Sequence, residues 1–385
     1  MRPTKALINL AHLKANYLAI RKKTKTKVLA VVKADAYGHG VAEVVNALNS
    51  LSEKPEYFGV ALSEEGIALR ELKVKQPILI FEPPSVNNID EIIKYNLIPT
   101  VFCDEQLHLI EKYLKKNDVK NTLQLKTKIP KKIIRRRRIQ VEIDTGMGRL
   151  GVPFQEAVQF IEKIAVNDRF ILDGIYSHFA TSDETDKSFA QLQLKRFNAI
   201  VIKLQKKKIR PNVIHLANSG AILTMPEAYF DMVRPGISLY GYPPSQEITS
   251  SIKLKPVLSL ISEVASCRWF EKRESVSYGR KYFLKKRSQI ISVPIGYADG
   301  VYRNLTNKIF CIIKDKLYPQ AGRVTMDRIM FDVGEAKIKI GDKVILLGKS
   351  KSHSIDAWNW SKQLDTIPYE ITCNISKRVP RMYIG

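Results

Sequence analysis

A lysine stands where a buried strand is expected to end, near the start of the chain. Residues 28–32 form an apolar run without polar alternation, which is typical of a strand buried on both faces in a parallel sheet. Lys33 follows directly, and α/β folds place their chemistry at the carboxyl ends of parallel strands. The stem of Lys33 can be buried while its amine faces a cleft. Gly38 and Gly40 then allow a sharp turn or a close approach to a ligand. A lysine snorkelling at a strand end explains the same residues.

Two later stretches carry groups that can bind an anion. Residues 215–220 read His-Leu-Ala-Asn-Ser-Gly, and residues 233–241 read Val-Arg-Pro-Gly-Ile-Ser-Leu-Tyr-Gly. They follow the seventh and eighth expected strands. In barrels, the loops after these two strands are the usual phosphate site, where hydroxyls and backbone N–H groups bind the anion. Taken singly, each of these residues would be an ordinary turn residue.

The elements that must position these groups alternate between strand and helix signals. Strands are expected at residues 28–32, 57–62, 78–81, 99–102, 139–143, 172–178, 213–216 and 232–234, with helical patterns between them. Eight such units over about 210 residues predict a (β/α)8 TIM-type barrel. A doubly wound open sheet is the alternative, which the absence of G-x-G-x-x-G and P-loop signatures weakens.

The pattern changes after Tyr242. Pro243 and Pro244 introduce a loop, and short β-rich runs follow at residues 257–267, 289–293, 309–313, 329–333 and 344–347. The predicted fold class is therefore α/β, with an N-terminal barrel domain at residues 1–242 followed by a mostly β C-terminal domain at residues 243–385.

Composition excludes several classes of protein. No signal-peptide core and no apolar run of membrane-spanning length is present, so we expect a soluble, cytoplasmic protein. Cys103, Cys267, Cys311 and Cys373 are widely spaced without a Cys-x-x-Cys pair, so neither a disulfide framework nor a metal site is predicted.

The formal net charge is +25, and positive charge is densest between Lys115 and Arg138. This stretch lacks interleaved aromatic residues, and no nucleic-acid-binding motif accompanies it. We interpret it as a solvated insertion, which disfavours nucleic acid as a partner. Loss of polyanion binding on deletion of residues 120–136 would support the opposite interpretation.

The lysine stretch has a more specific meaning when it is taken as a whole. Residues 31–40 read Val-Val-Lys-Ala-Asp-Ala-Tyr-Gly-His-Gly, which resembles the cofactor-lysine signature of the alanine racemases, fold-type III enzymes that use pyridoxal 5′-phosphate (PLP). Further matches lie at residues 141–152, 175–180, 215–220, 233–241, 276–280, 294–300, 322–327 and 368–370. The resemblance covers nearly the whole chain, with the basic stretch as its main gap. It implies that Lys33 binds PLP covalently and later acts as an acid/base.

The resemblance also implies which residues hold the cofactor. The residues around its phosphate would be Tyr37, Ser219, Gly236, Ile237 and Tyr369, and Asn218 would also bind the cofactor. His178 would support active-site side chains through hydrogen bonds. Arg234 would face the pyridine nitrogen and, because arginine does not readily release its proton, would leave that nitrogen unprotonated. The cofactor would then be a moderated electron sink, which favours returning a proton to Cα. A PLP decarboxylase of similar barrel fold would be expected to present an acidic partner there.

Two further residues are implied to bind the substrate. Arg149 matches an arginine that meets the substrate carboxylate, which suits the planar guanidinium fork, and Met326 would contact the carboxylate through its backbone. The family commonly has a lysine, often carbamylated, where this chain has Glu142. We hypothesise that Glu142 supplies the negative charge itself and pairs directly with Arg149. A glutamate that merely faces solvent is the alternative.

The second domain is implied to complete the site of another subunit. Racemisation needs a base on each face of a planar carbanion, and Tyr278 matches the second acid/base, supplied across a dimer interface. The residues that match supporting or entrance positions are Asp183, Tyr297, Arg303, Arg323 and Asp327.

We therefore predict a homodimeric PLP-dependent racemase that interconverts L-alanine and D-alanine and supplies D-alanine for peptidoglycan. Lys33 and the other subunit's Tyr278 would be its two bases. A racemase of broader amino-acid specificity is one alternative. A PLP decarboxylase on the same barrel is a second, against which Arg234 argues. A non-catalytic PLP carrier is a third, and such a protein would usually lack the β domain.

Overall fold

The computed structural model describes residues 2–124 and 136–385. Residues 125–135 of the basic stretch between Lys115 and Arg138 lie outside these residues, so the interpretation of the stretch as an insertion stays a prediction there, whereas residues 115–124 belong to the helix Asp104–Gln124. The last two residues of the stretch, Arg137 and Arg138, lie within a strand of the barrel. Within the described part of the chain, no helix is long and apolar enough to cross a membrane.

Eight parallel strands close into a barrel in the first half of the chain. In chain order they are β2 (Lys27–Val31), β3 (Tyr57–Val60), β4 (Ile78–Ile80), β5 (Ile98–Val101), β6 (Arg137–Asp144), β8 (Phe170–Tyr176), β9 (Val213–His215) and β10 (Met232–Val233). Each strand pairs with the next, and β10 pairs with β2, which completes the ring. The short β7 (Val152–Pro153) adds to β6. The predicted (β/α)8 barrel is confirmed, and the open sheet is excluded by the β10–β2 pairing.

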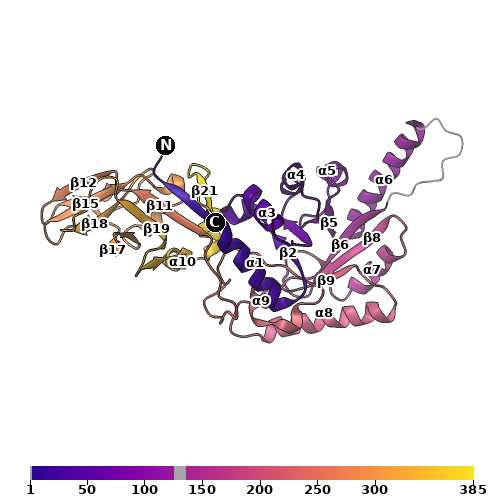
Figure 1. The fold of residues 1–385 in the computed structure, drawn as a ribbon. Coiled ribbons are helices and arrows are strands. Elements are labelled where there is room, and N and C mark those ends of the chain that lie inside the picture. Colours follow the sequence, from indigo (N-terminus) through magenta and orange to yellow (C-terminus); the bar gives the residue numbers. More distant parts are fainter. Residues whose placement is uncertain (1, 125–135) are drawn as a thin grey trace.

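Helices cover the outside of this barrel (Figure 1). They are α1 (Leu10–Thr24), α3 (Val41–Asn49), α4 (Ser63–Glu71), α5 (Ile89–Lys94), α6 (Asp104–Gln124), α7 (Ala157–Ala165), α8 (Ser188–Lys206) and α9 (Ser219–Thr224). The longest fully described one, α8, shows why they pack: Leu194, Phe197, Val201 and Leu204 recur every three or four residues and are buried.

The second domain is mostly β, as predicted. Its longer strands are β11 (Leu258–Glu263), β12 (Ser266–Phe270), β15 (Ser288–Val293), β16 (Phe310–Ile313), β17 (Lys316–Pro319), β18 (Ile329–Gly334), β19 (Lys343–Lys349) and β21 (Arg381–Ile384). The short strands are β13 (Ser275–Val276), β14 (Tyr282–Phe283) and β20 (Ser354–Ile355), and two helices, α10 (Ala357–Leu364) and α11 (Pro368–Cys373), precede β21.

The first strand of the chain belongs to the sheet of the second domain. Strand β1 (Lys5–Asn9) pairs antiparallel with β11 and parallel with β21. These two partners are the first and the last strand of the second domain. Ala6 and Ile8 are buried in alternation with less buried neighbours, as a strand with one core face requires. The division at residues 242 and 243 therefore does not hold for residues 5–9. In Figure 1 the β domain lies to one side of the barrel, with α1 and β21 at the junction.

The turn after β2 is left-handed. In α2 (Lys33–Gly38), the four residues from Ala34 to Tyr37 have φ values of 53°, 51°, 54° and 55°. L-residues disfavour this conformation by about 1–2 kcal/mol each and adopt it mostly as single residues. Gly38 continues it with φ +80° and packs against the backbone of α11, where an added Cβ would lie 2.2 Å from the carbonyl oxygen of Thr372.

We expect Gly38→Ala to lower the free energy of unfolding by about 2–4 kcal/mol, because a methyl group at this φ must also displace the α11 backbone. Gly334→Ala is the matched control, since Gly334 has φ +62° and nothing lies within 4 Å of its added Cβ. It should lose only about 1 kcal/mol. Denaturant titration of both variants measures the difference, and equal losses would contradict the role of the contact with α11.

Candidate active site

A cavity of about 470 Å³ lies at the carboxyl ends of the barrel strands. Twelve residues that sequence reasoning singled out line it: Lys33, Tyr37, Glu142, Arg149, His178, Asp183, Asn218, Ser219, Arg234, Gly236, Ile237 and Tyr369. They come from segments that are far apart in the chain. The closed barrel therefore gathers the lysine, the arginines and the anion-binding loops around one space.

Lys33 is half-buried in this cavity. Burial lowers the pKa of its amine, the positive charge of Arg149 lowers it further, and the carboxylate of Glu65 opposes both effects. Glu65 also fixes the backbone, since its Oε1 accepts a hydrogen bond of 2.6 Å from the amide of Ala34 and its Oε2 one of 2.8 Å from Ala61. A lysine with a lowered pKa is more readily deprotonated, as a nucleophile or base must be.

Aromatic rings pack against the left-handed turn. The ring of Tyr37 stacks on Tyr240 with centroids 4.8 Å apart and lies 5.8 Å from Tyr369. The ring of His39 also stacks on Tyr240, with centroids 4.5 Å apart. Its Nδ1 lies 3.0 and 2.9 Å from the carbonyl oxygens of Ala36 and Tyr37, so Nδ1 carries the proton and donates to the turn. Among the described residues, the hydroxyls of Tyr37 and Tyr369 have no hydrogen-bond partner.

Arg234 anchors a buried polar chain at the floor of the cavity. Its Nη1 donates to Nδ1 of His215 at 2.9 Å, and its Nη2 donates to the carbonyl of Ser177 at 2.6 Å. His215 therefore carries its proton on Nε2 and donates to Gln140 at 2.8 Å. Burial lowers the pKa of Arg234 to about 10, so it stays protonated at neutral pH. Its Nε–H has no acceptor within the described chain and remains available to a ligand in the cavity.

The anion-binding loops meet at one side of the cavity. Asn218 caps α9, accepting a hydrogen bond from the amide of Ala221 at 3.1 Å. Ser219 Oγ accepts hydrogen bonds from the amides of Gly236 and Ser238 at 3.0 and 3.3 Å. Among the described residues, the amide of Ile237 makes no hydrogen bond. An added Cβ on Gly236 would lie 2.5 Å from the hydroxyl of Tyr37, so only glycine leaves this cradle open.

These features fit the phosphate and ring of PLP. The cradle offers the unpaired amide of Ile237 and two tyrosine hydroxyls for the phosphate, Arg234 offers an unpaired donor for the ring nitrogen, and Lys33 offers an amine. A phosphate needs several N–H and O–H donors, and the cavity supplies them from three different loops.

Glu142 is buried on β6 among positive charges. Burial raises the pKa of its carboxyl group, while the charges of Arg149 and Arg234 lower it. Its Oε2 accepts a hydrogen bond of 3.3 Å from the hydroxyl of Tyr176. The hypothesis of a direct pair with Arg149 does not match this geometry: in the described chain, the two side chains form no ion pair within 4.0 Å. Arg149 lies on an exposed loop, whereas Glu142 is buried on its strand.

Apart from Tyr369, which lines the barrel cavity, the predicted residues of the β domain gather in a second place. A hollow of about 580 Å³ is lined by Tyr278, Tyr297, Arg303, Val324, Thr325, Met326, Asp327 and Arg328. Arg323 lies beside it, with its guanidinium carbon 3.4 Å from where a Cβ on Gly279 would be. None of these residues lines the barrel cavity. Within one chain, the two candidate acid/base residues Lys33 and Tyr278 therefore occupy different hollows.

Sequence reasoning missed several residues that shape the barrel cavity. Glu65 was not quoted at all, and Tyr176, Tyr240, His215 and His39 were quoted only as parts of motifs. A histidine directly after a buried strand was the available signal for His215. No local signal marks Glu65, because its partner Ala34 lies 31 residues away.

Comparisons with known proteins agree with the residues in both hollows. Residues 8–244 match the family model described as alanine racemase, N-terminal domain, and residues 257–383 match the one described as alanine racemase, C-terminal domain. Alanine racemase 1 of Clostridium acetobutylicum is 38% identical over 100% of this chain and 96% of its own length. The alanine racemase of Treponema denticola is 39% identical over 100% of this chain and 99% of its own length. The solved alanine racemase of Clostridium difficile 630 superposes with a TM-score of 0.88 at 34% identity, covering 99% and 96% of the two chains.

Stability should depend on pH through three histidines, of which His39 and His215 are fully buried and His178 is half-buried. Burial lowers the pKa of His39 to about 4, and burial together with the charge of Arg234 holds the pKa values of His178 and His215 well below 6.5. The unfolded chain binds protons on these rings near pH 6.5 while the folded chain does not. The contribution of these histidines to the free energy of unfolding should therefore be complete above pH 6.5. It should decrease as the pH falls towards 4, by up to about 1.4 kcal/mol per pH unit for each histidine.

Denaturant unfolding between pH 7 and pH 4.5 measures this slope. His39→Asn keeps an N–H donor for the turn but cannot titrate, so it should remove about one third of the slope. A variant with the wild-type slope would contradict the assignment of a neutral His39.

Proposed function

Because the chain belongs to the alanine racemase family, we propose that it interconverts L-alanine and D-alanine with PLP as its cofactor. Membership of the family makes it an enzyme, a racemase. The observation that carries the finer proposal is the cavity at the barrel mouth, where a lysine of lowered pKa, a buried arginine and an open anion cradle face one another. A role in supplying D-alanine for peptidoglycan belongs to the same proposal.

In the proposed mechanism, the chain holds the cofactor and moves protons at Cα. When bound, PLP supplies the electron sink that makes the Cα–H bond of the amino acid acidic. Ser219, Gly236, Ile237 and the two tyrosines would bind its phosphate, and Arg234 would donate to its ring nitrogen. Because Arg234 only donates, the nitrogen stays without a proton and the sink stays moderate. That restraint favours return of the proton to Cα over loss of carbon dioxide.

Two bases from two subunits would exchange the proton. Lys33 would take or return it on one face of Cα, and Tyr278 of a second copy on the other. Their separation into two hollows of one chain supports a shared site in a homodimer. Arg149 and the backbone of Met326 would hold the substrate carboxylate.

We also propose the division of the remaining chain at residues 242 and 243, and a cytoplasmic location.

A hybrid dimer tests the function and the sharing of the site together. Lys33→Ala and Tyr278→Phe homodimers should each lose about 100-fold or more in L-alanine racemisation. A hybrid with one subunit of each kind, isolated through two affinity tags, contains one intact site if the bases come from different subunits. It should recover about half of the wild-type activity. A chiral assay with L-alanine, L-serine and L-lysine measures both recovery and substrate breadth.

A tagged Lys33→Ala homodimer purified in the same way is the control for carry-over. A folded hybrid dimer with no more activity than its parents would overturn the shared site. Wild-type holoenzyme that racemises serine or lysine but not alanine would overturn the substrate.

Glu142 gives a separate prediction. Its carboxylate lies within the field of Arg149 and Arg234 and should keep Arg149 oriented through charge rather than contact. Glu142→Gln should raise the KM for alanine by about three- to tenfold, because losing one charge at this range weakens the binding of the substrate by about 1 kcal/mol. Glu142→Asp keeps the charge and should stay closer to wild type. Steady-state kinetics decide, and an unchanged KM in the glutamine variant would sink the hypothesis.

A further inference from the structure

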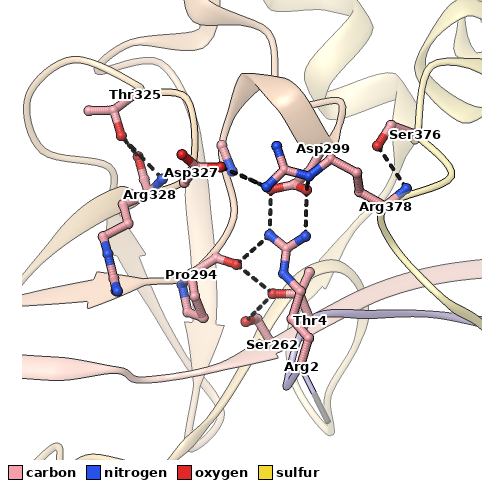
Figure 2. Close-up of polar contacts among 11 residues, drawn as sticks. Arg2, Thr4, Ser262, Pro294, Asp299, Thr325, Asp327, Arg328, Ser376 and Arg378 are labelled. Carbon is pink, nitrogen blue, oxygen red and sulfur yellow. Dashed lines mark hydrogen bonds and ion pairs between the residues drawn. The ribbon is translucent and has the colours of Figure 1, made fainter.

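A buried carboxylate in the β domain holds its own turn and two distant segments together (Figure 2). Asp299 is fully buried, and Arg2 donates to both of its oxygens at 2.6 and 2.5 Å. The amide of Gly296 donates to the same group at 3.0 Å, and Arg378 forms an ion pair with it at 3.5 Å. Arg378 also donates to Asp327 at 2.7 Å. A buried charge with this many partners fixes each of them strongly, because leaving it unpaired costs several kcal/mol.

Asp299 ends a short turn, residues 296–299, whose backbone is hydrogen-bonded to the loop that carries Met326. The amides of Tyr297 and Ala298 donate to the carbonyl oxygens of Thr325 and Met326 at 2.9 and 3.1 Å. An added Cβ on Gly296 would lie 2.2 Å from the Thr325 oxygen, so the two backbones touch. The turn and the loop must therefore move as one unit. The amide of Met326 itself makes no hydrogen bond within the described chain, and its side chain is 52% exposed.

The segment that carries Arg378 is tied at its other end to the lysine turn. Arg381 donates to the carbonyl oxygen of Gly38 from Nε at 3.2 Å and from Nη2 at 3.1 Å. Its remaining donors bind carbonyl oxygens of residues 375–379 at 2.5 to 2.9 Å. The amide of Ser376 donates to the carbonyl oxygen of Asp299 at 3.1 Å. Residues 374–381 thus contact the Lys33 side and the Met326 side of the chain through separate hydrogen bonds.

We propose that residues 374–381 form a strut that positions two active-site elements at once. Through Arg381 the strut holds the lysine turn of its own subunit, and through Arg378 it holds the loop with which Met326 completes the site of the other subunit. Both arginines are positioning residues, since neither lines the cavity that contains Lys33. The strut rests on the proposed function, in which the Met326 loop serves the second copy. Disturbing either end should loosen the other.

The test is Arg378→Gln in the PLP-loaded full-length protein. Arg378 is half-exposed, so the variant should fold. The matched control is Arg287→Gln, which breaks an exposed arginine–carboxylate pair with Glu271 in the same domain, and Arg378→Lys tests rescue. Hydrogen–deuterium exchange is followed at residues 322–328 and 34–40, and steady-state kinetics with L-alanine at the same time. We expect faster exchange at both regions and a KM raised by about three- to tenfold with kcat within about twofold. In both exchange and KM, Arg378→Lys should lie between wild type and Arg378→Gln, and Arg287→Gln should match wild type.

Faster exchange at only one of the two regions, or an unchanged KM, would overturn the double role. Equal effects in the Arg287→Gln control would overturn it as well, because they would mark a general loss of stability. The exchange measurement does not need turnover. A wild-type protein without racemase activity would therefore refute the proposed function, while exchange at the two regions would still decide whether the strut links them.

Discussion

The left-handed turn after β2 is the constraint on which the rest of the site depends. Four consecutive residues, 34–37, hold a conformation that costs about 1–2 kcal/mol each, so the surrounding structure must over-determine it. Glu65 fixes the first amide of the turn, His39 donates to two of its carbonyl oxygens, and Arg381 binds the carbonyl oxygen that follows them. Three side chains from three segments therefore pin one strained loop, and the direction in which Lys33 leaves the strand follows from it.

A second constraint is the polar chain through the barrel interior. Arg234 at the cavity floor is linked through His215 and Gln140 to Asp173, which is fully buried and pairs with Arg138 at 2.6 Å. Every link joins a donor to an acceptor, so the barrel can bury a guanidinium whose Nη1 and Nη2 groups are both paired. The same chain fixes the tautomer of His215. With that acceptor in place, Arg234 keeps its proton and one donor stays directed at the ligand space.

Sequence patterns predicted the closed barrel and the residues around its mouth because both rest on local signals. Apolar runs mark the buried strands, and a residue directly after such a run, such as Lys33, must lie at the barrel mouth. Long-range pairing was invisible: β1 was not foreseen, since its partners lie more than 240 residues away. The left-handed turn was also invisible, because Ala34 and Ala36 are not residues that favour positive φ. The predicted direct pair of Glu142 with Arg149 was wrong for a third reason. The sequence gives the charge of each side chain but not the distance between them.

The exposed residues of the β domain become intelligible when the two hollows are considered together. Tyr278 is 72% exposed and Met326 is 52% exposed, although both are large hydrophobic side chains. The barrel cavity, in turn, has Lys33 and its neighbours on one side and an open rim on the other, where Arg149 is exposed. In the proposed two-base mechanism, the second base would act on the face of Cα opposite to Lys33, and in the described part of one chain Tyr278 does not line this cavity. The proposed dimer explains both the exposed side chains and the separation of the two bases. In it, the β-domain hollow of one copy covers the barrel cavity of the other. This contact would bury Tyr278 and Met326 and bring Tyr278 to the cavity of Lys33.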